Sequence, residues 1–145
     1  MSPATRTDPF LACNFRVEID GIQTASFSEV SGLEVEIDVV EYRNGNDAQN
    51  SVRKLPGLNK VTDITLKRGI TLDSSLWDWI NGFIQGNVSR RTMSIVLQDE
   101  LHNDVIQWNL FNAWPRKWGG PVFNAKSNEV AIETLVISYE RLERA

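Results

Sequence analysis

The residues with the most reactive side chains are few in this sequence and stand far apart. One histidine, His102, and one cysteine, Cys13, occur among its 145 residues. A nucleophilic triad needs a base beside its nucleophile, and a structural zinc site needs several Cys or His ligands. We therefore expect no catalytic residue, no metal ligand and no cofactor site. His102 is interpreted as an ordinary turn residue in the polar stretch 99–104, and Cys13 as a small buried side chain.

Three carboxylates alternate with apolar residues in the stretch 33–43, namely Glu34, Glu36 and Asp38. Such a group could hold a divalent cation or perform acid–base work. Residues two apart on a strand share one face, however, and a polar face of this kind is more often solvated. The sequence also lacks the glycine patterns that bind dinucleotides or phosphates. We therefore interpret the three carboxylates as one exposed face of a strand.

Aromatic side chains are the remaining candidates for a binding site, because they can line a ligand cavity. In a small β domain, tryptophans more often fill the core or a subunit interface. The residues alone leave both interpretations open. The five tryptophans are Trp77, Trp79, Trp108, Trp114 and Trp118.

Composition and charge narrow the class of protein. With 145 residues, 41% of them hydrophobic, the chain suits a single domain, residues 1–145, with a sizeable core. A formal net charge of -4 argues against general or sequence-specific nucleic-acid binding, which relies on clustered basic residues. No stretch resembles a signal peptide or reaches the ~18 uninterrupted apolar residues of a membrane span. We expect no membrane insertion, and folding and assembly in the cytoplasm.

One stretch, residues 74–86, has the pattern of an α-helix. Serines precede its first apolar residue and can cap the helix, with Asp78 completing an approximate capping box, and Gly86 can end it. Apolar residues recur at steps of three and four and predict one stripe that packs on something apolar. The stripe comprises Leu76, Trp79, Ile80, Phe83 and Ile84.

The rest of the chain alternates between apolar and polar residues, which predicts strands. About seven strands at short spacing, with one flanking helix, are typical of an antiparallel β-barrel or sandwich. Pro115, Gly119 and Pro121 are expected to break the chain between two of these strands. The clearest alternating stretches are 15–19, 33–43, 61–68, 93–97, 105–114 and 130–142.

Two segments lack this alternation. Residues 1–12 are interpreted as an N-terminal arm that is ordered by a neighbour. Residues 44–57 contain Asn-Gly and Pro-Gly pairs and predict a long polar loop, and loops of this length in compact domains are usually functional. Fixing the backbone of one residue costs roughly 1–2 kcal/mol, so we expect a partner to supply the order of the loop.

Eight short motifs follow one another along the chain in an order that resembles a known protein family. The order resembles that of the tube proteins of phage tails and of phage-tail-like contractile injection systems, from about Asp8 to Leu142. The chain departs from this family at Asn44-Gly45-Asn46 and at His102-Asn103, where the family favours glycines. Asparagine also tolerates positive φ, so we expect changes of loop detail and not of fold. The motifs are NFRVEIDG at 14–21, FSEVSGLEVE at 27–36, EYRNGN at 41–46, RKLPG at 53–57, ITLKRG at 64–69, LWDWI at 76–80, NAWP at 112–115 and NEVAIE at 128–133.

The resemblance implies a structural subunit without catalysis. It implies a β-barrel-like domain with one helix, six copies to a ring, and rings stacked into an inner tube within a contractile sheath. The implied partners are further copies of the chain, the sheath protein, baseplate or hub proteins, tube-terminating proteins, and a protein toxin or DNA as cargo. It further implies that the assembled chain becomes part of a virion or of a phage-tail-like particle.

Two sites follow from this resemblance. The face of Glu34, Glu36 and Asp38 is expected to point into the tube lumen, where an acidic wall would repel acidic cargo. The loop 44–57 is expected to be the assembly element that contacts a neighbouring subunit or ring. Two other hypotheses stay open from the residues themselves, a monomeric β-barrel that binds a small ligand and, third, an enzyme. The residues expected at the assembly loop are Arg43, Asn44, Gly45, Asn46, Asp47, Arg53, Lys54, Leu55, Pro56 and Gly57.

Overall fold

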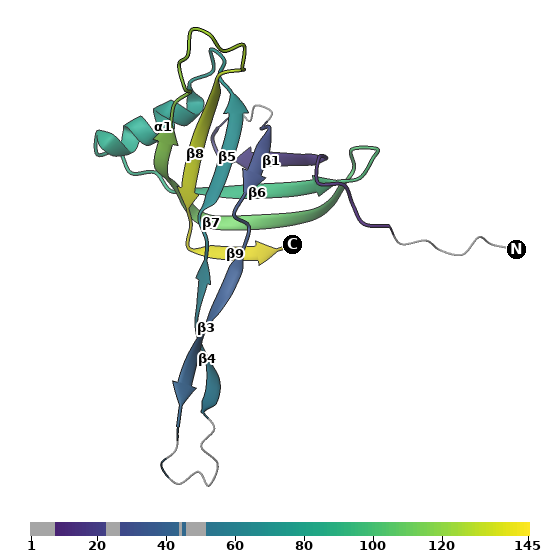
Figure 1. Cartoon of the computed structure of the whole chain (residues 1–145), viewed down its shortest axis with the longest axis vertical. Coiled ribbons are helices and arrows are strands. Elements are labelled where there is room, and N and C mark those ends of the chain that lie inside the picture. Colours follow the sequence, from purple (N-terminus) through teal and green to yellow (C-terminus); the bar gives the residue numbers. More distant parts are fainter. Residues whose placement is uncertain (1–7, 23–26, 44, 46–51) are drawn as a thin grey trace, which may run out of the picture.

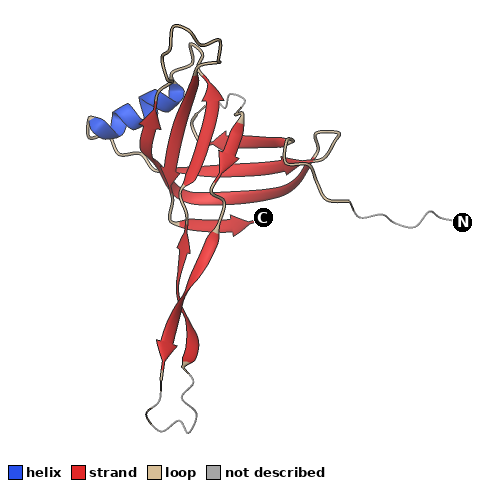
Figure 2. Cartoon of the chain, viewed as in Figure 1, coloured by secondary structure: helices blue, strands red, loops and turns tan. Residues whose placement is uncertain are grey.

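A computed structural model describes residues 8–22, 27–43, 45 and 52–145 (Figure 1). Within these residues the chain forms strands and one helix, as predicted (Figure 2). The elements are β1 (Phe15–Ile19), β2 (Glu29–Ser31), β3 (Val35–Tyr42), β4 (Arg53–Val61), β5 (Ile64–Gly69), α1 (Ser75–Ile84), β6 (Arg91–Gln98), β7 (Asp104–Gly119), β8 (Ile132–Ser138) and β9 (Arg141–Arg144).

Seven of the described strands form one antiparallel sheet in the order β1-β6-β7-β8-β5-β2, with β9 paired to β7. The long strand β7 belongs to both halves of this sheet. Its first part pairs with β6 and β9, and from Trp114 onward it pairs with β8. The path of paired strands is open at β1 and β2, so the described part of the chain is a sandwich and not a closed barrel. The predicted mainly β, antiparallel class with one helix is confirmed.

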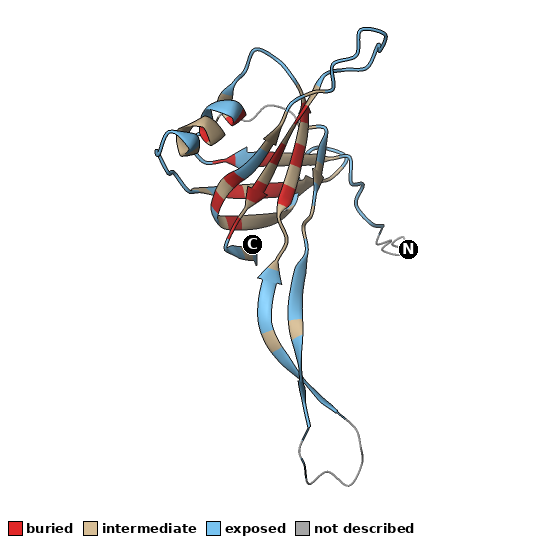
Figure 3. Ribbon diagram, turned by 60° about the vertical axis from the view of Figure 1, so that its left-hand side comes forward, coloured by how far each residue is buried: buried red, intermediate tan, exposed pale blue. Residues whose placement is uncertain are grey.

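The core lies between the two halves of the sheet. Alternate residues of β5 and β8 are buried, as the period of two requires (Figure 3). They meet the apolar faces of β1, β6 and β7, and Leu76 and Trp79 of α1 close one side of the cluster. The buried strand residues include Val17, Ile19, Ile64, Leu66, Met93, Ile95, Leu110, Leu135 and Ile137.

The helix differs from its prediction at both ends. It begins at Ser75, and its first N–H group donates to Asp73 Oδ1 at 3.0 Å. Ser74 does not cap the backbone, because its hydroxyl donates to Asp78 Oδ2 at 2.9 Å instead. Ile84 was expected on the apolar stripe but is 70% exposed. The capping carboxylate therefore comes from the residue before the two serines.

Three further expectations are wrong. Cys13 is exposed, because the segment before β1 lies at the surface and not in the core. Pro115 does not break the chain, since β7 continues through it to Gly119 with a register shift after Pro115. The single strand expected over residues 130–142 is two strands, β8 and β9, that pair with different parts of β7.

The backbone of His102, in the turn between β6 and β7, is strained. His102 has a φ of 61° there, a region that glycine enters without steric cost. We expect His102→Gly to raise the free energy of unfolding by about 0.5–1 kcal/mol in denaturant titrations. Asn103→Gly, one residue later, should lower it, because that residue has no positive φ to relieve. A His102→Gly protein less stable than the parent would contradict this account of the turn.

Candidate assembly surface

Strands β3 and β4 form a two-stranded sheet of their own that projects from the sandwich (Figures 1 and 2). The predicted loop 44–57 is therefore wrong in its second part, because residues 53–57 belong to β4. The reason is cross-strand pairing, in which Val40 faces Leu55 and Tyr42 faces Arg53. Pro56 is tolerated since both strands of a two-stranded sheet are edges. The candidate assembly element is thus a projecting hairpin.

The hairpin leaves the sandwich through a bend that has a local cause. Gly32, between β2 and β3, has a φ of 92°, and an added Cβ would lie 2.2 Å from the backbone oxygen of Asp63. In the connection between β4 and β5, the Thr62 hydroxyl donates to the Gly32 carbonyl at 2.5 Å, and the Thr62 N–H donates to the Glu34 carbonyl at 3.3 Å. The close approach of these two connections fixes where the hairpin begins.

A bulge interrupts the hairpin halfway along. The register shifts between Ile37 and Val39, so that β4 has one extra residue opposite Asp38. Gly57 stands at this point, and a Cβ there would lie 2.9 Å from a methyl carbon of Val40 and 3.1 Å from the Asp38 carbonyl oxygen. Glycine is required because the two strands approach closely at the bulge.

The residues expected at the assembly loop are only partly placed by the structure. Asn44, Asn46 and Asp47 lie outside the described residues, while Arg43 and Gly45 are exposed just beyond β3. The others are on β4, where all except Gly57 are exposed, namely Arg53, Lys54, Leu55 and Pro56. Their role in assembly stays a prediction.

The three carboxylates expected at the lumen lie at the base of the hairpin. Glu34 precedes β3, and Glu36 and Asp38 share one face of β3. None of them is in the core, and Asp38 forms an ion pair with Lys60 of β4 at 3.0 Å. The hydrogen bond and the charge of Asp38 raise the pKa of Lys60 above its ordinary value. The acidic row is therefore partly neutralised by its own hairpin, and its position in a lumen stays a prediction.

The hairpin also exposes apolar side chains that its own chain leaves uncovered (Figure 3). Val35, Ile37 and Val39 alternate on one face and are 57–62% exposed, and Leu58 at the bulge is 77% exposed. Val40, Tyr42 and Leu55 are about half exposed nearer the tip. Val40 and Tyr42 share the face of Glu36 and Asp38, so both faces of the hairpin carry exposed apolar side chains. Exposed apolar side chains in this number mark an interaction site. We call these seven residues the hairpin surface.

A buried ionic cluster lies inside the sandwich, on the faces of β5 and β8 that otherwise hold apolar residues. Arg68 Nε donates to Glu133 Oε1, and both residues are buried. Arg68 also reaches Asp73 before α1, with 3.3 Å between its Nη1 and Asp73 Oδ2, and Trp118 Nε1 donates to Glu133 Oε2 at 3.3 Å. The N–H group of Ser75 and, to a smaller extent, Arg68 lower the pKa of Asp73. The cluster joins β5, β7, β8 and the start of α1.

In the described part of the chain, no group of His, Cys, Asp and Glu residues could hold a metal ion. No described helix is long and apolar enough to cross a membrane. His102 lies in the β6–β7 turn, as predicted, where its N–H donates to the Asp99 carbonyl at 3.0 Å.

The fold and the projecting hairpin can now be compared with known proteins. The chain matches the family model of the T4-like virus tail tube protein gp19 over residues 11–143. It belongs to this tail tube family. Solved tail tube structures agree, and none of the curated protein sequences matches the chain significantly.

Two solved structures of an extracellular contractile injection system, PVC, are similar to this tail tube chain. One is a chain of the sheath–tube complex in the extended state, with 30% identity, a TM-score of 0.84, and coverage of 94% of this chain and 91% of that one. The other is a chain of the sheath/tube terminator, with 29% identity, a TM-score of 0.87, and coverage of 97% and 99%. A chain of the anti-feeding prophage cap is 27% identical, with a TM-score of 0.87 and coverage of 99% and 95%.

The predicted resemblance is therefore confirmed, and the monomeric ligand-binding barrel has no support. Two features of this tail tube chain were missed by reasoning from its sequence. The exposed apolar row on β3 was read as an ordinary strand face, although the adjacent pair Val39-Val40 interrupts the alternation and was a usable signal. The Arg68–Glu133 pair was missed although both residues occupy apolar phases of their strands.

Proposed function

We propose that this tail tube protein assembles as rings of six copies that stack into the inner tube of a contractile particle. In this assembly a sheath protein surrounds the tube, and baseplate or hub proteins and a terminator bind its ends. The sheath–tube complex, sheath/tube terminator and cap structures that are similar to the chain support a sheath and a terminator as partners. The number of copies per ring and the particle that receives the tube, a phage tail or an extracellular device, belong to the proposal.

The hairpin β3–β4 is the observation that carries this proposal. A two-stranded hairpin is marginally stable by itself in water, and this one projects with its apolar side chains exposed. An isolated subunit gains nothing from such a hairpin, whereas a neighbour that covers the hairpin surface removes it from water. The hairpin is therefore the assembly element of the proposed tube, in place of the longer loop inferred from the sequence.

The lumen of the proposed tube is lined in part by Glu34, Glu36 and Asp38. Glu34 and Glu36 are exposed and Asp38 is half-buried on the isolated chain, which supports this position, because charged side chains at a wall need water on one side. A negative wall would repel a DNA or acidic protein cargo and let it slide. A map of the assembled tube with Glu36 and Asp38 on the outer surface would contradict this part of the proposal.

The proposed role is structural, without catalysis, and the tube is assembled in the cytoplasm before the particle is complete. The match to the tail tube family supports this role. Turnover of a substrate that is lost when one polar residue is changed would argue against it.

Purified full-length protein tests the proposal directly. Size-exclusion chromatography and negative-stain images should show rings or tubes whose amount increases with protein concentration, because assembly follows mass action. Rotational averaging of end-on views gives the number of subunits per ring. A compact monomer at every concentration, also in the presence of the co-expressed sheath protein, would rule the proposed assembly out.

A further inference from the structure

A second exposed apolar surface lies at the opposite end of the molecule from the hairpin. It is formed by the connection between β5 and α1 and by the loop between β7 and β8, which lie together at the top of Figure 1. We call it the distal surface. Its apolar residues and their exposed fractions are Ile70 40%, Leu72 103%, Val122 93%, Phe123 90% and Val130 74%.

The second part of the β7–β8 loop, residues 124–131, is held by hydrogen bonds. Asn124 accepts from the N–H groups of Lys126 and Ser127, at 3.1 Å through its side chain and 3.0 Å through its carbonyl. The Ser127 hydroxyl accepts from the Glu129 N–H at 3.1 Å, and the Ile70 N–H donates to the Ala131 carbonyl at 2.8 Å. The part of the surface fixed in this way loses little conformational entropy when a partner binds.

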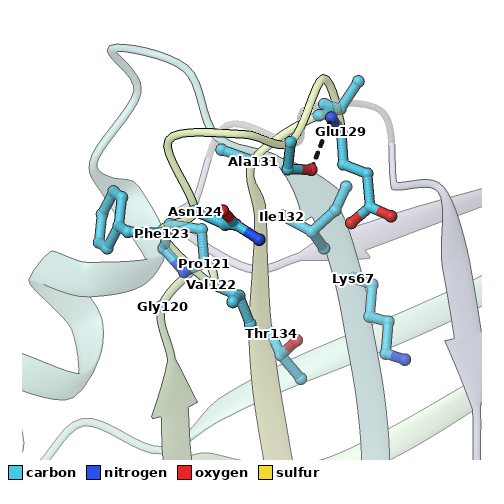
Figure 4. A pocket seen from close by; sticks show the side chains of 12 residues that line it. Lys67, Gly120, Pro121, Val122, Phe123, Asn124, Glu129, Ala131, Ile132 and Thr134 are labelled. Atoms are coloured by element: carbon cyan, nitrogen blue, oxygen red, sulfur yellow. Dashed lines mark hydrogen bonds between the residues drawn. The ribbon is translucent and has the colours of Figure 1, made fainter.

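The loop arches over a cavity of about 500 Å³ (Figure 4). The floor is formed by β5 and β8, with Lys67, Ile132 and Thr134, and the loop supplies Val122 and Glu129 to the wall. Lys67 is held by an ion pair with Glu29 at 3.3 Å. The cavity is open to solvent and has both apolar and polar walls. It can therefore receive a few side chains of a protruding element.

We infer that the distal surface and its cavity bind the hairpin β3–β4 of a second copy of this chain. This inference rests on the proposed function and names the acceptor of the hairpin. The hairpin β3–β4 lies at one end of the longest axis and the β7–β8 loop at the other (Figure 1). The hairpin exposes apolar side chains, and the opposite end combines exposed apolar side chains with the cavity. The two surfaces differ, so their contact is heterologous and leaves one of each free for the next copy. Such a contact repeats without closing, as a stacked tube requires.

Charge agrees with this pairing. Lys54 is exposed on β4 close to the tip of the hairpin, and Glu129 stands at the rim of the cavity with no ion pair to the described residues. Opposite charges at the rim of an apolar contact set the orientation of two partners more than they add affinity. The pairing of Lys54 with Glu129 would therefore fix which way the hairpin enters.

Cysteine cross-linking tests the contact in the assembled full chain. In a Cys13→Ser background, Leu55→Cys and Val122→Cys are combined, and assembled protein is treated with a short bismaleimide. A short linker reports proximity without the narrow geometry of a disulfide. The expected result is a ladder of covalent dimers, trimers and longer species, because each copy donates one hairpin and accepts another. Leu55→Cys with Leu101→Cys, an exposed residue in the β6–β7 turn, is the matched control and should give no ladder.

The variant with Leu55→Cys alone tests the competing arrangement, in which the hairpins of two copies bind each other. A hairpin that bound another hairpin would give covalent dimers with Leu55→Cys alone, because an isologous contact places the same residue on both sides. Dimers of that kind, or tubes whose Leu55→Cys and Val122→Cys variants give no ladder, would overturn the inference while leaving the proposed tube intact. Protein that forms neither rings nor tubes would instead refute the proposed function.

Discussion

Replacing Arg68 by methionine is expected to lower the free energy of unfolding by about 3–5 kcal/mol, the effect of leaving a buried charge without its partner. Arg68 is 2% exposed and Glu133 is 6% exposed. Without the guanidinium, the described residues leave Glu133 the bond from the Trp118 indole, at 3.3 Å, and no positive charge beside its buried carboxylate. Denaturant titration followed by circular dichroism measures the loss.

Adding Glu133→Gln to Arg68→Met shows whether the loss of stability comes from the unpaired charge of Glu133 or from the changed shape of the side chain at residue 68. Glu133→Gln keeps an acceptor for Trp118 but removes the charge, so Arg68→Met with Glu133→Gln should recover most of the stability that Arg68→Met loses. Lys67→Met is the control on the same strand, since its ion pair with Glu29 is exposed and worth at most about 1 kcal/mol. If Arg68→Met were no more harmful than Lys67→Met, the cluster would have no structural role.

This cluster also shows where reasoning from the sequence ends. The alternation of β5 and β8 was readable, because an apolar residue at every second position predicts a strand with one buried face. The same alternation places Arg68 and Glu133 on the buried faces, where charged residues are not expected. The reason for these two buried charges is the pairing of β5 with β8, which sets Arg68 opposite Glu133. That pairing joins residues 65 apart, and no local pattern contains it.

The hairpin shows a second limit. The helix and most strands were predictable, since their signals are local. Strand β4 was not predicted before Val61, because Pro56 and Gly57 are typical of turns and have strand geometry here only through pairing with β3. The family resemblance supplied the idea of an assembly element, and the pairing of β3 with β4 supplied its shape. The distal surface had no sequence signal at all, because its residues lie in two loops that are distant along the chain.

A charge on the hairpin surface is expected to abolish tube formation without unfolding the subunit. Val39 is 62% exposed on β3, so Val39→Asp should change the free energy of unfolding by no more than about 0.5 kcal/mol. In the assembled tube the same carboxylate would be buried without a partner, at a cost of roughly 2–5 kcal/mol per contact. Every subunit of a ring carries the substitution, so the cost is repeated at each contact. Negative-stain images and sedimentation should therefore show single rings or monomers.

The control for this variant is Leu101→Asp, which adds the same charge to an 81% exposed residue in the β6–β7 turn. Both variants change the net charge equally, so a general effect of charge on solubility would affect both. Only Val39→Asp introduces the carboxylate into the proposed contact between copies. Normal tubes from Val39→Asp would mean that β3 stays exposed to water after assembly. The exposed valine and isoleucine side chains of β3 would then have no role in assembly. That result would be unexpected, because burial of apolar surface is the main driving force of a contact between subunits.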